Sequence, residues 1–407
     1  MAVTAPSEPL AEAPASKGAA RRTLAIACGA HVLHDGYADL VWVALPLWQA
    51  EFALSYAAVG FLRTVFSGTM AALQVPSAAL ARRLGNAAVL AFGTALAGLC
   101  YGIAGLSAGV GLLLAALLLG GFGTSTQHPL ASAMVAEAFV GPRALPALGT
   151  YNFAGDVGKV MLPAAATALL LVMPWRPAYG LLGLVGIAAG IAIFALTPRS
   201  VQHHAGGDDA TQADAADASR RGFKPGYFDL LAIGAIDNVT RNAFLVFLPF
   251  VMIGNGASIT TAGFAVTLVF VGGAAGKLGY AWLAARFGAV ATICLSKALT
   301  ACGMLVLLVL PLAAALPLLP LFGVVLNGSS SVIYGSVPQF AEPGERNRAF
   351  SWFYTGTLVP GALAPAVAGS VGDIAGIPAA VAMLAALILV VLPLALRLRP
   401  ALDKRTA

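Results

Sequence analysis

Long apolar segments separated by short polar ones run along almost the whole chain. A membrane-spanning helix needs about 20 mostly apolar residues. Segments that meet this requirement lie near residues 23–50, 57–80, 87–107, 110–137, 144–172, 177–197, 227–253, 260–284, 289–311, 313–340, 347–371 and 376–396. The one long hydrophilic interruption falls between the sixth and the seventh segment. The pattern therefore predicts an all-α membrane protein with 12 transmembrane helices in two six-helix halves.

The polar segments set the predicted domain boundaries. We expect a disordered cytoplasmic tail over 1–22, a first six-helix bundle over 23–197, a cytoplasmic linker over 198–226, a second bundle over 227–396 and a tail over 397–407. The first tail is rich in Ala, Pro and Ser and lacks a compact apolar core followed by a cleavage site. It is therefore interpreted as a tail and not as a signal peptide.

The two halves repeat each other at an offset of 203 residues. The segments that coincide are Leu45-Pro46-Leu47 with Leu248-Pro249-Phe250, Ala81-Arg82-Arg83-Leu84-Gly85 with Ala284-Ala285-Arg286-Phe287-Gly288, Gly120 with Gly323, and Gly158 with Gly361. Several separate matches at one offset indicate an internal duplication. Two repeated bundles are typical of secondary transporters, in which the substrate site lies near the midplane between the repeats.

Composition and charge agree with this interpretation. Hydrophobic residues make up 59% of the chain and charged residues only 10%, against about 25% charged in soluble proteins. Of the 23 Lys and Arg residues, 17 fall on the side of the predicted termini and only Arg176 on the other. The positive-inside rule then predicts a multi-pass protein of the inner membrane with both termini in the cytoplasm. This placement explains the net charge of +6 without a nucleic-acid partner.

Ionisable residues inside the spans carry the main functional signal. His31, Asp35 and Asp39 recur at every fourth position of span 1, and His34 lies beside them. Charged groups at this depth are unfavourable unless they face a polar cavity or a partner. Neighbouring acids and histidines can exchange protons near neutral pH, so we expect these four residues to couple transport to protons. A purely structural role for the two carboxylates is the alternative.

Two further spans contain an acid and a base at helical spacing. Asp156 and Lys159 are three residues apart on span 5, and Asp237 and Arg241 are four apart on span 7. Both spacings place the side chains on one helix face and predict local ion pairs. Each pair is interpreted either as structural or as a gate that breaks when substrate binds.

Three bases inside spans have no local partner. Arg63 lies in the outer third of span 2, where it either anchors an anionic substrate or extends to the membrane surface. Lys277 and Lys297 lie nearer the cytoplasmic ends of their spans, so we expect both to extend to the interface. His31, His34 and Asp35 could bind a divalent metal, but their spacing does not require one, and no metal is predicted.

The chain resembles the major facilitator superfamily over essentially its whole length. The loop after span 2 carries Arg82, Arg83 and Gly85, and its second copy carries Arg286 and Gly288. Of these residues, Arg83, Gly85, Arg286 and Gly288 match the arginine and the final glycine of the G-x-x-x-D-R-x-G motif of the family, a conformational loop. The first glycine and the aspartate of the motif are missing, and Arg82 stands at the position of the aspartate. Within the family, Gly29-Ala30-His31 with Asp35-Gly36, and His128-Pro129 with Ala131-Ser132, are similar to the fosmidomycin-resistance branch of drug exporters.

The resemblance implies that spans 1, 4, 7 and 10 line a central cavity. This would place His128 of span 4 and the polar stretch from Asn327 to Tyr334 of span 10 at the substrate. The predicted substrate-binding residues are Arg63, His128, Arg241, Asp237, Asn327 and Tyr334, and the predicted charge-pairing residues are Asp156 and Lys159.

The sequence therefore favours a monomeric, proton-coupled efflux antiporter for a small anionic or amphiphilic compound. Proton-linked uptake of an organic anion is the alternative within transport. A transporter-like receptor or structural membrane protein is the alternative outside it. No phosphate-binding G-x-x-x-x-G-K-[ST] motif occurs. We expect neither an enzyme nor a cofactor.

Overall fold

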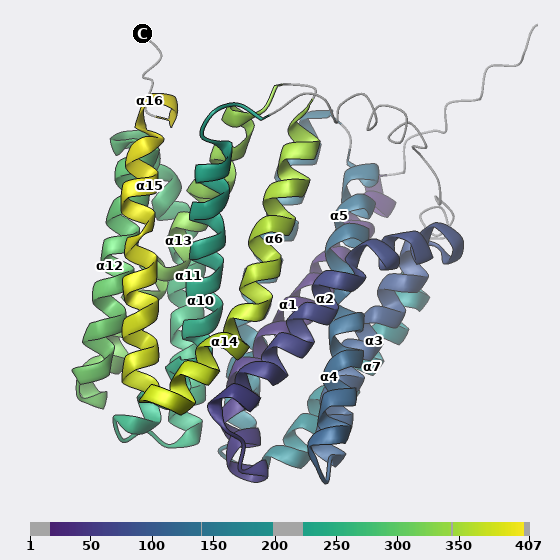
Figure 1. Ribbon diagram of the computed structural model, residues 1–407. Helices are drawn as coiled ribbons and strands as arrows, with labels where there is room; N and C mark the ends of the chain where they lie inside the picture. Colours follow the sequence, from purple (N-terminus) through teal and green to yellow (C-terminus); the bar gives the residue numbers. More distant parts are fainter. Residues whose placement is uncertain (1–16, 140, 198–222, 343–344, 403–407) are drawn as a thin grey trace, which may run out of the picture.

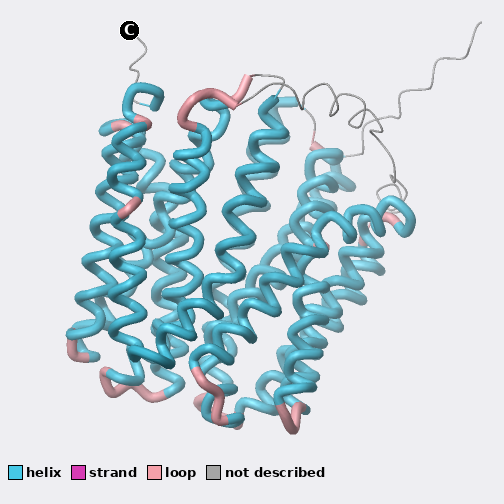
Figure 2. The backbone as a smooth tube through the Cα atoms, viewed as in Figure 1, coloured by secondary structure: helices cyan, strands magenta, loops and turns pink. Residues whose placement is uncertain are grey.

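The computed structural model describes residues 17–139, 141–197, 223–342 and 345–402, and within these ranges every regular element is a helix (Figure 2). Residues 1–16 and 198–222, which include most of the predicted tail and linker, lie outside the described part. The elements are α1 (Lys17–Phe52), α2 (Tyr56–Leu84), α3 (Asn86–Leu106), α4 (Val110–Ser125), α5 (Gln127–Ala138), η1 (Gly141–Arg143), α6 (Ala144–Leu169), α7 (Trp175–Leu196), α10 (Tyr227–Gly254), α11 (Ile259–Phe287), α12 (Ala289–Val309), α13 (Leu312–Ser336), η2 (Val337–Phe340), α14 (Arg346–Leu389), α15 (Val391–Arg397) and α16 (Arg399–Leu402).

These helices make up the twelve predicted spans. Helices α4 and α5 form one span, because the backbone of Thr126 between them keeps helical dihedral angles. Helix α14 contains two spans, because Gly376 inside it has a φ of 84° and breaks the helical path. Among the described residues, nine helical segments are long and apolar enough to cross a membrane. The exceptions include α1 and α6, which carry the buried charges of the candidate site.

The helices form two six-helix bundles with the same local construction. Ser55 caps the N-terminus of α2, and Ser258 caps α11 at the equivalent position of the second half. Gly85 and Gly288, which end these two helices, have φ values of 89° and 90°. Because only glycine adopts such a conformation without strain, this requirement explains why the loop motif keeps its final glycine in both copies.

The bundles meet most closely where α2 and α14 cross. Because the number of spans is even, both described chain ends lie on the same side of the molecule. We call this side the terminal side and the opposite side the distal side. Near the distal side a methyl group at Gly60 would overlap the carbonyl of Pro365, and one at Gly369 would overlap that of Tyr56. The two backbones therefore touch, and from this contact α2 and α14 diverge toward the terminal side (Figure 1).

A carboxylate strengthens this distal contact. Asp373 of α14 accepts hydrogen bonds from the backbone N–H groups of Tyr56, at 2.7 Å, and Ala57, at 2.9 Å. These N–H groups lie in the first turn of α2 and have no partner within their own helix. The second half therefore caps a helix of the first half.

Candidate functional site

A cavity of about 330 Å³ lies between the two bundles, near the middle of the long helices. Its wall is formed by α1, α2, α5 and α6 from the first half and by α10, α11, α13 and α14 from the second. The charged and polar residues that line it are Asp35, Asp39, Arg63, His128, Asp156, Lys159, Asn238, Arg241, Asn242, Lys277, Asn327, Ser330, Tyr334 and Tyr354. The cavity lies where the internal repeat predicts a substrate site.

Asp35 of α1 is the centre of the first-half wall. Its carboxylate lies 3.3 Å from Nε2 of His31, 3.6 Å from Nε2 of His128 and 3.4 Å from the ammonium of Lys159. The predicted stripe on span 1 thus brings His31 and Asp35 together, and His128 in the first turn of α5 lies against both of them. Only 8% of Asp35 is exposed, so its charge depends on these partners.

The hydrogen bond of His31 fixes which of its ring nitrogens faces Asp35. Nδ1 lies 2.8 Å from the carbonyl oxygen of Tyr151. A carbonyl only accepts, so Nδ1 carries a hydrogen and Nε2 of the neutral ring presents a lone pair to Asp35. Two acceptors at 3.3 Å repel each other unless a proton is held by one of them. The geometry therefore creates a place for a proton between His31 and Asp35.

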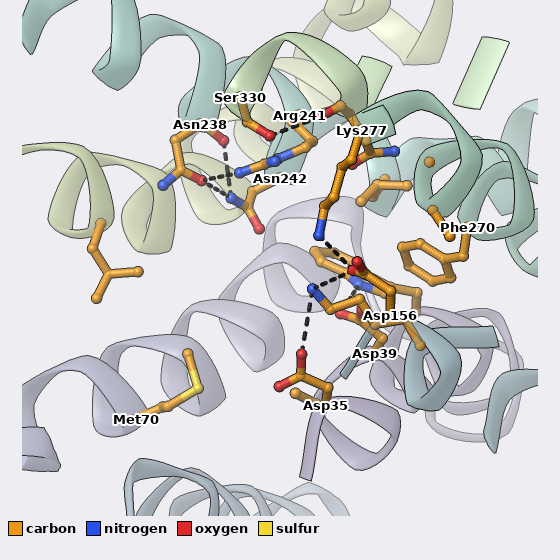
Figure 3. Close-up of a pocket in the computed structure, with 18 of the residues that line it drawn as sticks. Asp35, Asp39, Met70, Asp156, Asn238, Arg241, Asn242, Phe270, Lys277 and Ser330 are labelled. Atoms are coloured by element: carbon orange, nitrogen blue, oxygen red, sulfur yellow. Dashed lines mark hydrogen bonds and ion pairs between the residues drawn. The ribbon is translucent and has the colours of Figure 1, made fainter. Parts of the chain in front are cut away.

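Lys159 and Asp156 of α6 extend this cluster toward the second half. Their ion pair, predicted from the spacing, is confirmed at 3.8 Å. The same Asp156 oxygen, Oδ1, also lies 2.5 Å from the ammonium of Lys277 on α11. The expectation that Lys277 extends to the membrane surface is therefore wrong, because it bonds across the interface between the halves (Figure 3).

Arg63 is buried beside the cavity. Only 5% of it is exposed, its Nη1 donates to the carbonyl of Ala38 at 2.7 Å, and its guanidinium lies 3.9 Å from the ring centroid of Trp42. The alternative in which Arg63 extends to the surface is wrong. Asp39, the remaining acid of the stripe, accepts a hydrogen bond from the indole of the same Trp42.

Apart from Lys277, the second-half wall consists of neutral hydrogen-bonding groups around the cation of Arg241. Arg241 of α10 donates to the amide oxygen of Asn238 at 3.3 Å, and Asn242 donates to the same amide. No ion pair of Arg241 is found among the described residues. Figure 3 shows Arg241 with Asn238, Asn242 and Ser330, apart from Asp35. Asn327 and Tyr334 line this wall, in agreement with their predicted place at the cavity.

The predicted ion pair between Asp237 and Arg241 is wrong. Asp237 bonds instead to Lys297 of α12, and neither residue lines the cavity. Lys297 is completely buried, so the expectation that it extends to the membrane surface is also wrong. Helical spacing alone could not reveal this, because the better partner of Asp237 lies 60 residues away on a neighbouring helix. Its predicted contact with substrate has no support in this arrangement.

His34 is also separated from the cluster in which it was placed. Its Nε2 lies 2.7 Å from Oγ1 of Thr94 on α3, and the ring is buried away from the cavity. His34 and Thr94 occupy the positions that Asp237 and Lys297 occupy in the second half, at the same offset of 203 residues. The repeat thus uses one interior contact twice, once as a neutral hydrogen bond and once as an ion pair.

Three groups at this site have the ligand types that bind metal ions. One ligand atom each from His31, Asp35 and His128 lie within 4.8 Å of one another. The ammonium of Lys159, however, contacts the same carboxylate at 3.4 Å and already supplies a positive charge there. A divalent cation would have to displace it.

Sequence reasoning missed that Lys159 contacts both Asp35 and Asp156, and it did not place Asn238 and Asn242 at the cavity. A usable signal existed for one of them, since Asn238 is the repeat equivalent of Asp35. Both of these residues line the cavity, each from its own half.

The arrangement of two similar six-helix bundles around a polar midplane cavity defines a membrane transporter fold. The model of the Major Facilitator Superfamily matches residues 27–236 and again residues 230–407. The chain belongs to the major facilitator superfamily. It is a multi-pass membrane protein, and the double match agrees with the internal repeat.

Solved structures support the same fold at low sequence identity. A bacterial homologue of the human lysosomal transporter Spinster, in an inward-facing and occupied conformation, has a TM-score of 0.78 at 16% identity and covers 97% of this chain and 100% of its own. A nucleoside transporter gives 0.75 at 12% identity, with 92% and 99% covered. A peptide transporter gives 0.75 at 13%, with 97% and 96% covered. Among curated protein sequences there is no significant match.

Proposed function

We propose that this chain is a proton-coupled carrier that exports a small anionic compound by alternating access. The observation that carries the proposal is the charge distribution in the cavity. Four cationic residues (Arg63, Lys159, Arg241 and Lys277) line it against three acids (Asp35, Asp39 and Asp156). One positive charge is in excess, and an anionic substrate would neutralise it.

The two walls suggest separate tasks. The acids and histidines belong to the first half, where the contact between His31 and Asp35 offers a place for a proton. Arg241 belongs to the second half and has amide and hydroxyl groups beside it. We assign the proton to the first wall and the negative group of the substrate to Arg241. Arg63 remains a second candidate anchor, although its charge also interacts with that of Asp39.

Export is proposed because the motifs around His31 and His128 resemble those of the fosmidomycin-resistance exporters. Proton-linked uptake of an organic anion uses the same residues and is the alternative. In this proposal the protein is a monomeric carrier of the inner membrane, with both termini in the cytoplasm, and it carries out no covalent step.

The test uses purified protein in liposomes that contain a pH-sensitive dye. A panel of carboxylates, phosphonates, neutral compounds and cationic compounds is added under a preset proton gradient. We expect one anion to move protons, in the direction opposite to its own if the protein is an antiporter. Asp35→Asn should abolish proton movement, and Arg241→Gln should raise KM about tenfold or more, since a charge-assisted contact contributes about 1.5 to 3 kcal/mol.

The matched control is Lys224→Gln. This lysine forms an ion pair with Glu342 outside the cavity, at 3.1 Å, and its loss should leave transport unchanged. If protons move only with neutral or cationic compounds and Arg241→Gln has no effect, the anion assignment is wrong. If the protein is folded but neither protons nor any of the compounds cross the membrane, the receptor alternative is favoured over transport.

A further inference from the structure

Four alternating charges form a continuous chain from the proposed proton site to the interface between the halves. They are Asp35 on α1, Lys159 and Asp156 on α6, and Lys277 on α11. The first three belong to the first half and the last to the second half. Figure 3 shows Lys277 reaching down to Asp156, with Asp35 below it.

Both lysines approach the same oxygen atom. Oδ1 of Asp156 lies 2.5 Å from the ammonium of Lys277 and 3.8 Å from that of Lys159. Two ammonium groups around one oxygen repel each other. Lys159 stays at the longer distance because the carboxylate of Asp35 attracts it from the other side, at 3.4 Å. Its side chain is about one-third exposed and has room to move.

We propose that Lys159 transmits the protonation of Asp35 to the contact between the two halves. When Asp35 takes up a proton, it loses the charge that holds Lys159. Lys159 then moves onto Asp156 and displaces Lys277, so the bond between α6 and α11 weakens. This inference rests on the proposed function, because it takes Asp35 as the site of proton uptake.

The place of this bond gives it a mechanical consequence. Farther toward the distal side, the same two helices pack directly against each other, with Gly263 of α11 against Thr167 of α6 and Val43 of α1. The bond between Asp156 and Lys277 closes the cavity end of that contact. Its loss therefore favours separation of α6 from α11 and access to the cavity from the distal side.

Other charged or titratable groups also surround Asp35 and contribute to its proton affinity. They are His31, His34 and Asp39 on α1, His128 on α5, Tyr151 and Asp156 on α6, Lys277 on α11 and Tyr354 on α14. Of these, only Asp156 and Lys277 lie on the route to the second half. The experiment must therefore separate proton uptake from its transmission.

The test measures distal opening without substrate. Spin labels are placed at Leu106→Cys and Val309→Cys, exposed residues at the distal ends of α3 and α12 that are repeat equivalents. The four native cysteines are replaced by serine or alanine. Electron–electron resonance then gives the distance distribution between the labels in lipid nanodiscs at several pH values.

We expect Asp35→Asn, which resembles the protonated state, to increase the long-distance population about tenfold at every pH, within the range of couplings measured in ion-pair networks. Lys277→Gln should do the same. In the Lys159→Gln background, Asp35→Asn should have no further effect, and lowering the pH should no longer lengthen the distance. Lys224→Gln should keep the full pH response.

The possible failures are distinguishable. If Asp35→Asn shifts the distance equally with and without Lys159, the transmission by Lys159 is overturned and the proton site stands. If Lys277→Gln lengthens the distance but Asp35→Asn and pH do not, the transmission from Asp35 is overturned, and proton movement by Asp35→Asn in the liposome assay decides separately whether the proposed function stands. If Lys277→Gln has no effect either, the bond between Asp156 and Lys277 does not hold the distal side closed. The pH series on the native and Lys159→Gln proteins gives the same decision if Asp35→Asn does not fold.

Discussion

Among the described residues, interior ion pairs join different helices more often than neighbours on one helix. Asp237 is the clearest case, because Arg241 is available one turn away but Lys297 of α12 holds it. A fully buried ammonium is stable only when a carboxylate compensates its charge. The pair therefore fixes the position of α12 against α10, and it leaves Arg241 free to face the cavity.

Breaking this pair should destabilise the protein strongly. Lys297→Met leaves Asp237 buried without a counter-charge, and we expect a loss of about 3 to 5 kcal/mol in the free energy of unfolding. Thermal unfolding in detergent measures it. The double variant with Asp237→Leu should recover most of the loss. A single variant as stable as the native protein would show that Arg241 turns toward Asp237 and replaces Lys297.

The equivalent contact in the first half should respond much less. His34 and Thr94 form a neutral hydrogen bond at the same place. Thr94→Val removes one partner, and we expect a loss of about 1 to 3 kcal/mol in the same measurement, since an unpaired neutral group is less unfavourable than an unpaired charge. A loss as large as that of Lys297→Met would indicate that His34 is charged in the folded protein.

The sequence predicted the cavity residues of α1, α5 and α13 well but the charge pairing poorly. Asp35 was placed at the site because charged groups inside a span must face a cavity or a partner. His128, Asn327 and Tyr334 were placed there because the family resemblance implies that spans 4 and 10 line the cavity. Which acid meets which base depends on how the helices pack against one another. Helical spacing reveals the contacts of His31 with Asp35 and of Asp156 with Lys159, but not that Asp35 also contacts Lys159 and Asp156 also contacts Lys277.

At the scale of elements, the contact between α2 and α14 depends on the absence of side chains. Gly60 and Gly369 allow the two backbones to touch near the distal side. Helix boundaries were predictable because apolar runs end at polar or glycine-containing loops, and the spans agree with the expected ranges to within a few residues. The closeness of α2 and α14 was not predictable, since glycine is frequent throughout the chain.

A methyl group at this contact should separate the two helices. Gly60→Ala places it against the carbonyl of Pro365, which cannot move aside as a flexible side chain would. We expect a longer distance between labels at Leu106→Cys and Val309→Cys. Gly68→Ala is the matched control, because it lies on the same helix and its methyl group would meet nothing within 4 Å. An unchanged distance in Gly60→Ala would mean that the contact does not limit distal opening.

At the scale of the whole molecule, the two halves are joined near the distal side and diverge toward the terminal side (Figure 1). The number of spans and the repeat followed from the sequence. The relative tilt of the halves could not be predicted, because the sequence of a carrier must be compatible with more than one tilt.

This arrangement predicts one-sided access to the cavity. Met70 lines the cavity from α2. In a cysteine-free background, Met70→Cys should react with a membrane-impermeant maleimide added on the side of the termini and only slowly from the other side. Leu106→Cys, at the distal end of α3, should react rapidly with maleimide added on the distal side and only slowly with maleimide added on the side of the termini. Comparable reaction of Met70→Cys from both sides would contradict a distal closure.

The cap that Asp373 places on α2 has a consequence for how the halves could have diverged after duplication. Ser258 caps α11 at the position equivalent to Ser55, but the residue equivalent to Asp373 in the first half is Leu170, which cannot accept a hydrogen bond through its side chain. The molecular twofold is therefore broken at the distal rim. A chimera that replaces the second half with a second copy of the first would lose this bond, so the descendants of one ancestral bundle are no longer interchangeable.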